Sequence, residues 1–164
     1  MDKILTYTIT SQEAGMQVLE FLRSKGFSRH ILTSMKPDKE ALLVNGVRAG
    51  GRSILKEGDF LRVRVMETAT TEGIVPASLP LNILYEDEDI LVLNKPADMP
   101  VHPSIGNYTN TLANAAAFYF QERGEFCPFR CINRLDRDTS GALVLAKNAL
   151  SAAILSAQMR NREI

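Results

Sequence analysis

The chain has 164 residues, of which 45% are hydrophobic and 23% charged, and its formal net charge is zero. This composition is that of a folded globular protein and argues against a disordered chain. The longest apolar runs, such as residues 142–146, are too short to cross a membrane, and the N-terminal residues lack the apolar core of a secretory signal. We therefore expect a cytoplasmic protein with no membrane partner.

Two cysteines, Cys127 and Cys131, accompany only two histidines in the whole chain. This set falls short of a zinc site, and the two cysteines are expected to be reduced intracellular thiols. We therefore expect no bound metal.

The charges are unevenly distributed although they cancel overall. Residues 1–66 hold 11 Lys and Arg against 7 Asp and Glu, a balance of +4, whereas residues 67–164 hold 8 against 12, a balance of −4. Such an asymmetry favours contact of the first half with a polyanion. A basic face that is merely solvated is the alternative that charge alone leaves open.

The first half begins with two predicted helices. Apolar residues within 18–22 give a helical stripe that ends near Gly26. Ser28 has the character of an N-cap for a second short helix, which directs Ile31, Leu32 and Met35 inward and ends at residues 37–38.

Short strands follow the helices. Residues 41–44 and the run from 47 onward flank Asn45-Gly46, which is the strongest local signal for a hairpin. After a turn at residues 58–59, a strand over 60–65 is expected to direct Phe60 and the valines inward and Arg62 and Arg64 outward.

This order resembles the RNA-binding domain first described in ribosomal protein S-four. The resemblance rests on Ser28-Arg29, Val44-Asn45-Gly46 and residues 56–59, and it covers about residues 12–66. It implies an RNA-binding domain over residues 1–66. The basic side chains on or beside the helices and hairpin are suited to neutralise phosphates: Arg23, Lys25, Arg29, His30, Lys36, Arg48 and Arg52.

A Thr-, Pro- and Ala-rich stretch over 67–80 is predicted to be a linker to a second unit, residues 81–164. There we expect strands at 81–85 and 90–94 around an acidic turn, and then a Pro-rich loop over 95–103. A helix over 111–123 is capped by Asn110 or Thr111, a strand covers 142–146, and a last helix extends from Asn148 to about residue 160.

Charge is concentrated between apolar elements in residues 132–141. Arg134 and Asp136 are two residues apart, so in an extended chain their side chains point the same way while Leu135 points into the core. Gly141 permits a sharp turn or a close backbone approach.

This segment resembles the signature of the RluA family of pseudouridine synthases, particularly its RluC- and RluD-like members. Arg134-Leu135-Asp136 and Thr139-Ser140-Gly141 match it, supported by residues 84–96 and 99–103. The resemblance implies that Asp136 is the catalytic aspartate and that Arg134 fills the space left by a flipped uridine. It also implies a reaction that needs no cofactor. Asn133 and Asp98 depart from the family pattern, which has His and Gly there.

The candidate substrate-binding set is Arg134, Thr139, Ser140, Gly141, Lys95 and His102. For the loop residues Lys95 and His102, a packing role is an equally good interpretation. Asp138 invites a rival reading as half of a carboxylate pair for glycoside hydrolysis or metal binding. Nothing else in the sequence supports that reading, and we interpret Asp138 as structural.

We therefore predict an α+β protein: a two-helix and β-hairpin RNA-binding domain, a linker, and part of a mixed or antiparallel-sheet catalytic domain. The resemblance implies isomerisation of uridine in structured RNA, ribosomal RNA ahead of transfer RNA. In the family the sheet continues past the length present here, so we expect a C-terminally truncated form, inactive alone, whose open sheet edge favours self-association. The alternative is a non-catalytic RNA-binding protein that uses the synthase scaffold as a platform.

Overall fold

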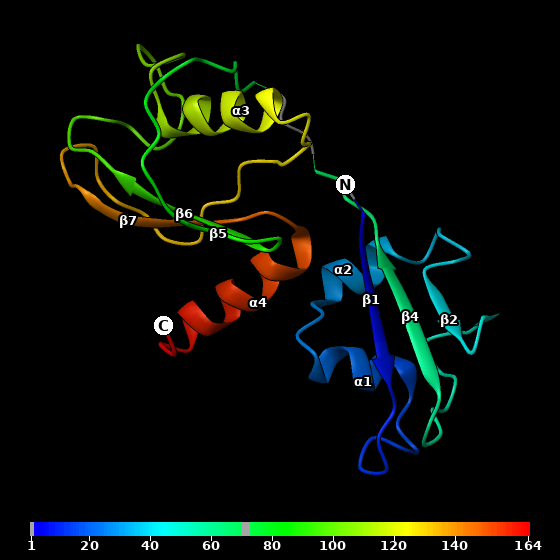
Figure 1. The fold of residues 1–164 in the computed structure, drawn as a ribbon. Coiled ribbons are helices and arrows are strands. Elements are labelled where there is room, and N and C mark those ends of the chain that lie inside the picture. The colour runs from blue at the N-terminus through cyan, green and yellow to red at the C-terminus, as the bar shows by residue number, and fades with distance from the viewer. Residues whose placement is uncertain (1, 70–72) are drawn as a thin grey trace. The chain divides into compact units, whose positions relative to one another are not determined.

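The protein consists of two compact units, Asp2–Thr68 and Ala69–Ile164. The structure is a computed structural model that describes residues 2–69 and 73–164 (Figure 1). Each unit combines helices with one antiparallel sheet, so the predicted α+β class and antiparallel pairing are confirmed. None of the helices in the described ranges is long and apolar enough to cross a membrane.

The first unit packs two short helices against a four-stranded sheet with the order β1-β4-β2-β3. Its elements are β1 (Lys3–Thr8), α1 (Val18–Ser24), α2 (Arg29–Ser34), β2 (Leu42–Val44), β3 (Val47–Arg48) and β4 (Phe60–Val65).

The helix cap and the hairpin turn predicted for this unit are confirmed. The Ser28 hydroxyl accepts a hydrogen bond from the Ile31 amide at 3.3 Å and so caps α2. Asn45 and Gly46 have φ values of 50° and 79°, the positive values that a two-residue hairpin turn requires. The Asn45 side chain also accepts from the Phe60 amide at 2.9 Å, which joins the hairpin to β4.

Two expectations about this sheet were wrong. Strand β1 was not predicted, yet it pairs with β4 along its whole length, from Lys3 opposite Val65 to Thr8 opposite Phe60. Phe60 does not point inward: 47% of it is exposed, because it shares the alternation of Arg62 and Arg64. The buried face of β4 is formed by Leu61, Val63 and Val65.

The second unit has a three-stranded antiparallel sheet, β5-β6-β7, with helix α3 over one face (Figure 1). Its elements are β5 (Ile83–Glu86), β6 (Ile90–Lys95), α3 (Leu112–Glu122), β7 (Gly141–Ala146) and α4 (Ala149–Arg160). The core joins the leucines of β6 and β7 to the inner side of α3: Leu91, Leu93, Leu143, Leu145, Leu112, Ala116 and Phe120. In α4 only Leu150 is buried, and the other residues predicted to point inward are half-buried.

The second part of the predicted linker packs onto the second unit. The carbonyl of Val75 accepts from the Asn114 side chain at 2.7 Å, and the Ala77 amide donates to the Asn114 carbonyl at 3.1 Å. Residues 70–72 of the linker lie outside the described residues. The segment before β5 is thus held against α3 by hydrogen bonds.

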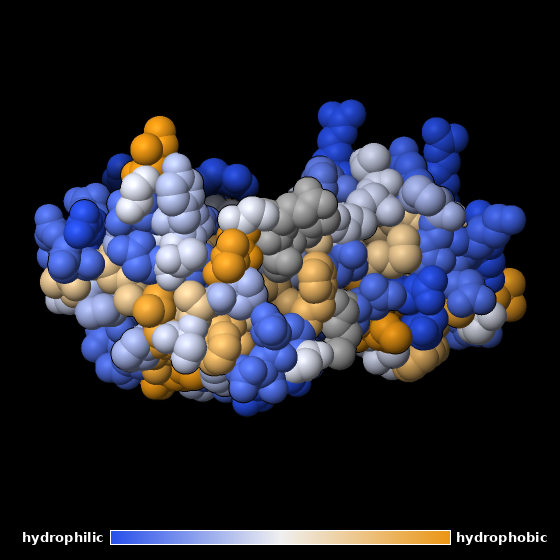
Figure 2. Space-filling model, turned by 90° about the horizontal axis from the view of Figure 1, so that it is seen from above, coloured by the Kyte–Doolittle hydropathy of each residue, from blue (hydrophilic) through white to orange (hydrophobic). Residues whose placement is uncertain are grey.

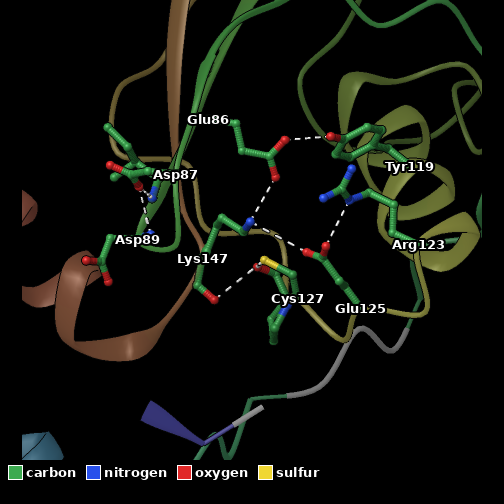
Figure 3. A network of polar contacts seen from close by, with 10 residues as sticks. Glu86, Asp87, Asp89, Tyr119, Arg123, Glu125, Cys127 and Lys147 are labelled. Carbon is green, nitrogen blue, oxygen red and sulfur yellow. Dashed lines mark hydrogen bonds and ion pairs between the residues drawn. The ribbon is translucent and has the colours of Figure 1, made fainter. Parts of the chain in front are cut away.

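An ion-pair network fixes α3 to one end of this sheet (Figure 3). Glu86, at the end of β5, accepts from the Tyr119 hydroxyl of α3 and from the Lys147 ammonium, which lies 2.8 Å away. Lys147 also lies 3.5 Å from Glu125, which in turn pairs with Arg123 at 2.8 Å. Because Lys147 follows β7 directly, the network links both outer strands of the sheet to α3.

Apolar side chains remain on the surface of the outer strand β5. Ile83, Leu84 and Tyr85 are all exposed. On the face drawn in Figure 2, hydrophobic residues are scattered among hydrophilic ones and form no single large patch.

Asn114 is the buried polar residue on which the start of α3 depends. Thr111 and Asn114 cap each other reciprocally, and the Asn114 amide also donates to the carbonyls of Val75 and Tyr108. We expect Asn114→Ala to lower the free energy of unfolding by about 2–4 kcal/mol, because it leaves several buried groups unpaired. Urea unfolding measures this. The exposed Asn110→Ala is the control, and equal losses in both variants would contradict the assignment.

Candidate active site

The segment before the charged motif runs alongside β7 and is joined to it by backbone hydrogen bonds. The Ala146 amide donates to the carbonyl of residue 130 at 2.9 Å, and the Ile132 amide donates to the Val144 carbonyl at 2.8 Å. Cys131 forms an isolated antiparallel bridge with Leu145. The motif therefore starts from a chain that is already in register with the sheet.

Asn133 ends this pairing with its side chain. Its amide nitrogen donates to the Ala142 carbonyl at 3.0 Å, and its amide oxygen accepts from the Val144 amide at 2.9 Å. A side-chain amide thus replaces a backbone group in the ladder, since it carries both a donor and an acceptor. The chain leaves the sheet at the next residue.

Arg134 and Asp136 are exposed, while Leu135 between them packs against the core of the second unit, as the spacing predicts. Gly141 has a φ of +147°, which side-chain-bearing residues rarely adopt, and a Cβ there would lie 3.7 Å from Leu135 Cδ1. Within the described ranges, no side chain forms a hydrogen bond or ion pair with the Asp136 carboxylate. A backbone bond from the Thr139 amide to the Asp136 carbonyl, 3.1 Å long, closes the turn.

The buried side chain of Lys95 binds the backbone of this turn. It is the last residue of β6 and is fully buried. Its ammonium donates to the carbonyls of Pro96 at 2.8 Å, Met99 at 2.9 Å and Arg137 at 2.9 Å, which uses all three of its protons. Burial lowers the pKa of Lys95, and the negative charges of Asp138 and Asp136 oppose that shift.

The burial of Lys95 favours the packing role over RNA contact, the two roles that the sequence left open. Contact with RNA requires an accessible ammonium, whereas this one joins the loop after β6 to the turn that carries Asp136. The sequence contained the signal: Lys95 alternates in phase with Leu91 and Leu93, which mark the buried face of the strand.

Asp98 adds a second link between the same two segments. Its carboxylate pairs with the Arg137 guanidinium at 2.7 and 2.9 Å, and the neighbouring Met99 amide donates to the Arg137 carbonyl at 3.2 Å. Asp98 has a φ of +59°, a conformation that glycine adopts most easily.

His102 lies close enough to Arg134 for the two charges to interact. Its ring packs edge-on against Phe129, with the centroids 4.9 Å apart. Burial and the positive charge of Arg134 both lower the pKa of His102, which favours a neutral imidazole. Nearby, burial raises the pKa of the Cys131 thiol to about 11, so this thiol is protonated at neutral pH.

The structure thus gathers most of the predicted site residues around one turn. Arg134, Asp136, Thr139 and Ser140 are exposed on it, Gly141 ends it, and His102 neighbours it. Because the turn is anchored to the sheet and to the loop after β6, its exposed carboxylate and guanidinium are held in place and can contact a bound molecule. The sequence alone does not show that Asn133 and Asp98 anchor the turn, although both depart from the pattern of the family that the segment resembles.

Comparison with known proteins shows what this region is similar to. The family described as RNA pseudouridylate synthase matches residues 89–164. The chain is 36% identical over 146 residues to the uncharacterized RNA pseudouridine synthase YjbO of Bacillus subtilis, covering 89% of this chain and 52% of that protein. It is 38% identical over 125 residues to YhcT of the same organism, another uncharacterized RNA pseudouridine synthase, covering 76% and 41%.

A third relative, the ribosomal large subunit pseudouridine synthase D of Xanthomonas campestris, is 36% identical over 138 residues, covering 84% of this chain and 41% of its own length. Residues 89–164 hold the complete turn with Asp136 and most of its anchors. The chain is thus similar, over this segment and beyond it, to proteins named as RNA pseudouridine synthases. It spans about half the length of the curated relatives it matches.

We expect Lys95→Met to lower the free energy of unfolding of the second unit by about 3 kcal/mol or more, because three carbonyls lose a buried charged donor. Arg137→Gln removes only the exposed pair with Asp98 and should cost less than about 1 kcal/mol. Urea unfolding of both variants measures the difference. A loss in Lys95→Met as small as that in Arg137→Gln would show that the ammonium is not an anchor.

A change at Asn133 should have a pH-dependent effect. Asn133→Asp keeps the acceptor for the Val144 amide but replaces the donor to the Ala142 carbonyl by an oxygen. We expect a loss of about 1–2 kcal/mol at pH 7 relative to the parent chain. This loss should shrink toward pH 4, where protonation restores a donor. Parallel unfolding curves of parent and variant test this, and equal deficits at both pH values would be inconsistent with the paired amide.

Proposed function

We propose that the chain provides the part of an RNA pseudouridine synthase that carries the catalytic aspartate, Asp136. The observation that carries this is the anchored turn at 134–141, which exposes Asp136 and Arg134 above a buried Lys95 and Leu135. Structured RNA is the proposed substrate. Ribosomal RNA is favoured over transfer RNA, because a relative is named a ribosomal large subunit synthase.

The reaction detaches uracil from its ribose, rotates it and rejoins it through carbon-5. The Asp136 carboxylate is suited to this either as a nucleophile or as a base that also stabilises a cation-like sugar. Arg134 lies beside it on the exposed side of the same turn and is proposed to occupy the space that the flipped uridine leaves. Thr139, Ser140 and Gly141 would line the approach, and His102 would contact RNA near Arg134.

We further propose that residues 1–66 bind RNA as an S-four-like domain. The seven basic residues predicted for this role are all exposed: Arg23, Lys25, Arg29, His30, Lys36, Arg48 and Arg52. One of them, Lys25, is engaged with Glu13 at 2.9 Å. The others are available for phosphates, which supports binding through the RNA backbone.

Asp136→Asn is expected to abolish pseudouridine formation, with a loss of about a thousandfold or more, because the amide cannot act as nucleophile or base. Tritium release from carbon-5-labelled uridine in RNA measures this, in the 164-residue chain and in any longer product of its gene. Asp138→Asn is the matched control and should retain activity. Undiminished turnover in Asp136→Asn would remove this residue from the mechanism, and RNA retention without any tritium release would favour the binding platform.

RNA affinity should fall steeply between about 50 and 200 mM salt, because a handful of phosphate contacts release counterions. Fluorescence anisotropy with a labelled RNA hairpin measures the slope. Arg29→Gln should make it shallower by about one unit. An affinity that does not change with salt would point to a surface that binds protein instead.

A further inference from the structure

The first unit contains a cavity of about 200 Å³ whose lining includes no residue of the turn at 134–141. It lies between α1, α2 and the β2–β3 hairpin with the loop that follows it. Half of the lining residues carry apolar side chains: Leu19, Leu32, Met35, Ala41, Leu42 and Ala49. These apolar side chains can accept an uncharged flat or aliphatic group.

The loop wall of this cavity is held in place. The Leu19 amide donates to the Gly51 carbonyl at 2.9 Å, and the Ala49 amide donates to the Leu42 carbonyl at 3.0 Å. A Cβ at Gly51 would lie only 2.5 Å from Leu19 Cγ, so glycine is what permits this approach. The cavity is therefore a preformed part of the unit.

Three cations line the same cavity: Lys36, Lys39 and Arg48. They are exposed, and no ion pair between them and another described residue is present. The one carboxylate in the lining, Asp38, is bound by the Arg64 guanidinium at 2.9 Å and accepts from the Glu40 amide at 2.9 Å. Its charge is compensated, which leaves a rim of unpaired positive charge around an apolar interior.

We propose that this cavity binds a single unpaired nucleotide of RNA, with the base against the apolar lining and the flanking phosphates on Lys36, Lys39 and Arg48. The inference rests on the proposed RNA binding of residues 1–66 and adds a specific site to it. The cavity is smaller than the roughly 300–1,000 Å³ of typical small-molecule sites. The apolar interior can contact a nucleobase while the surrounding cations bind its phosphates. Proteins commonly recognise structured RNA through such unstacked bases.

The test compares two RNA hairpins that differ only by one bulged nucleotide, bound to the full 164-residue chain and followed by fluorescence anisotropy. We expect the bulged RNA to bind about tenfold more tightly, the effect of one well-buried base. Ala49→Phe should fill the cavity and abolish this preference, while the affinity for the fully paired hairpin stays unchanged.

Gly50→Leu is a second filling variant, since a Cβ there meets only Ser53 Oγ at 3.9 Å. Arg52→Gln is the control: it removes an exposed cation outside the lining and should weaken both RNAs equally. Equal binding of the two hairpins, or a preference that survives both filling variants, would overturn the cavity site but leave RNA binding intact. Failure to bind either hairpin would overturn the cavity site together with the proposed RNA-binding function.

Discussion

The arrangement of the loops in the second unit depends on the hydrogen bonds of the buried Lys95 ammonium. A charged group can be buried only where all its protons find acceptors, and here three backbone carbonyls supply them. Two of these carbonyls belong to the loop after β6, and the third belongs to the turn after Asp136. The need to satisfy one ammonium therefore fixes the end of a strand, the next loop and a segment about 40 residues away in the same place.

The remaining anchors of the turn complete this arrangement. Leu135 packs into the core, Asn133 completes the ladder with β7, and the Asp98–Arg137 pair joins the outer parts of the two loops. The turn is stabilised by the packing of Leu135 and the hydrogen bonds of Asn133. Arg134 and Asp136 are therefore not needed to hold it in place. Among the described residues, the Asp136 carboxylate is therefore held in place without a side-chain partner, which is the preorganisation that the proposed catalytic role calls for.

Local signals in the sequence predicted much of the fold. Caps at Ser28 and Asn148 and the Asn45-Gly46 turn depend on neighbours a few residues away, and each was recognised correctly. The motif around Asp136 was likewise visible as a compact run of charges. These features are encoded within short windows, where residue type and spacing determine the geometry.

Long-range pairing was much harder to anticipate. Strand β1 is defined by its pairing with β4, more than 50 residues later, and its own half-exposed alternation is weak. Lys95 resembled a loop residue because a proline follows it, and only the alternation with Leu91 and Leu93 indicated burial. The ladder role of Asn133 requires knowing which strand lies beside it. The hydrogen bonds of Val75 and Ala77 with Asn114 were equally hard to predict, because both residues lie in a segment whose composition is that of a linker.

The central claim is that the turn with Asp136 is rigidly anchored to the loop after β6 before any RNA binds. Amide hydrogen exchange in the unmodified chain tests this most directly at Met99, whose amide donates to the Arg137 carbonyl, and at Thr139, whose amide donates to the Asp136 carbonyl. We predict that both exchange far more slowly than unprotected amides and approach the rates of neighbouring strand amides in β6. Exchange at the rate of an unstructured loop would contradict the account.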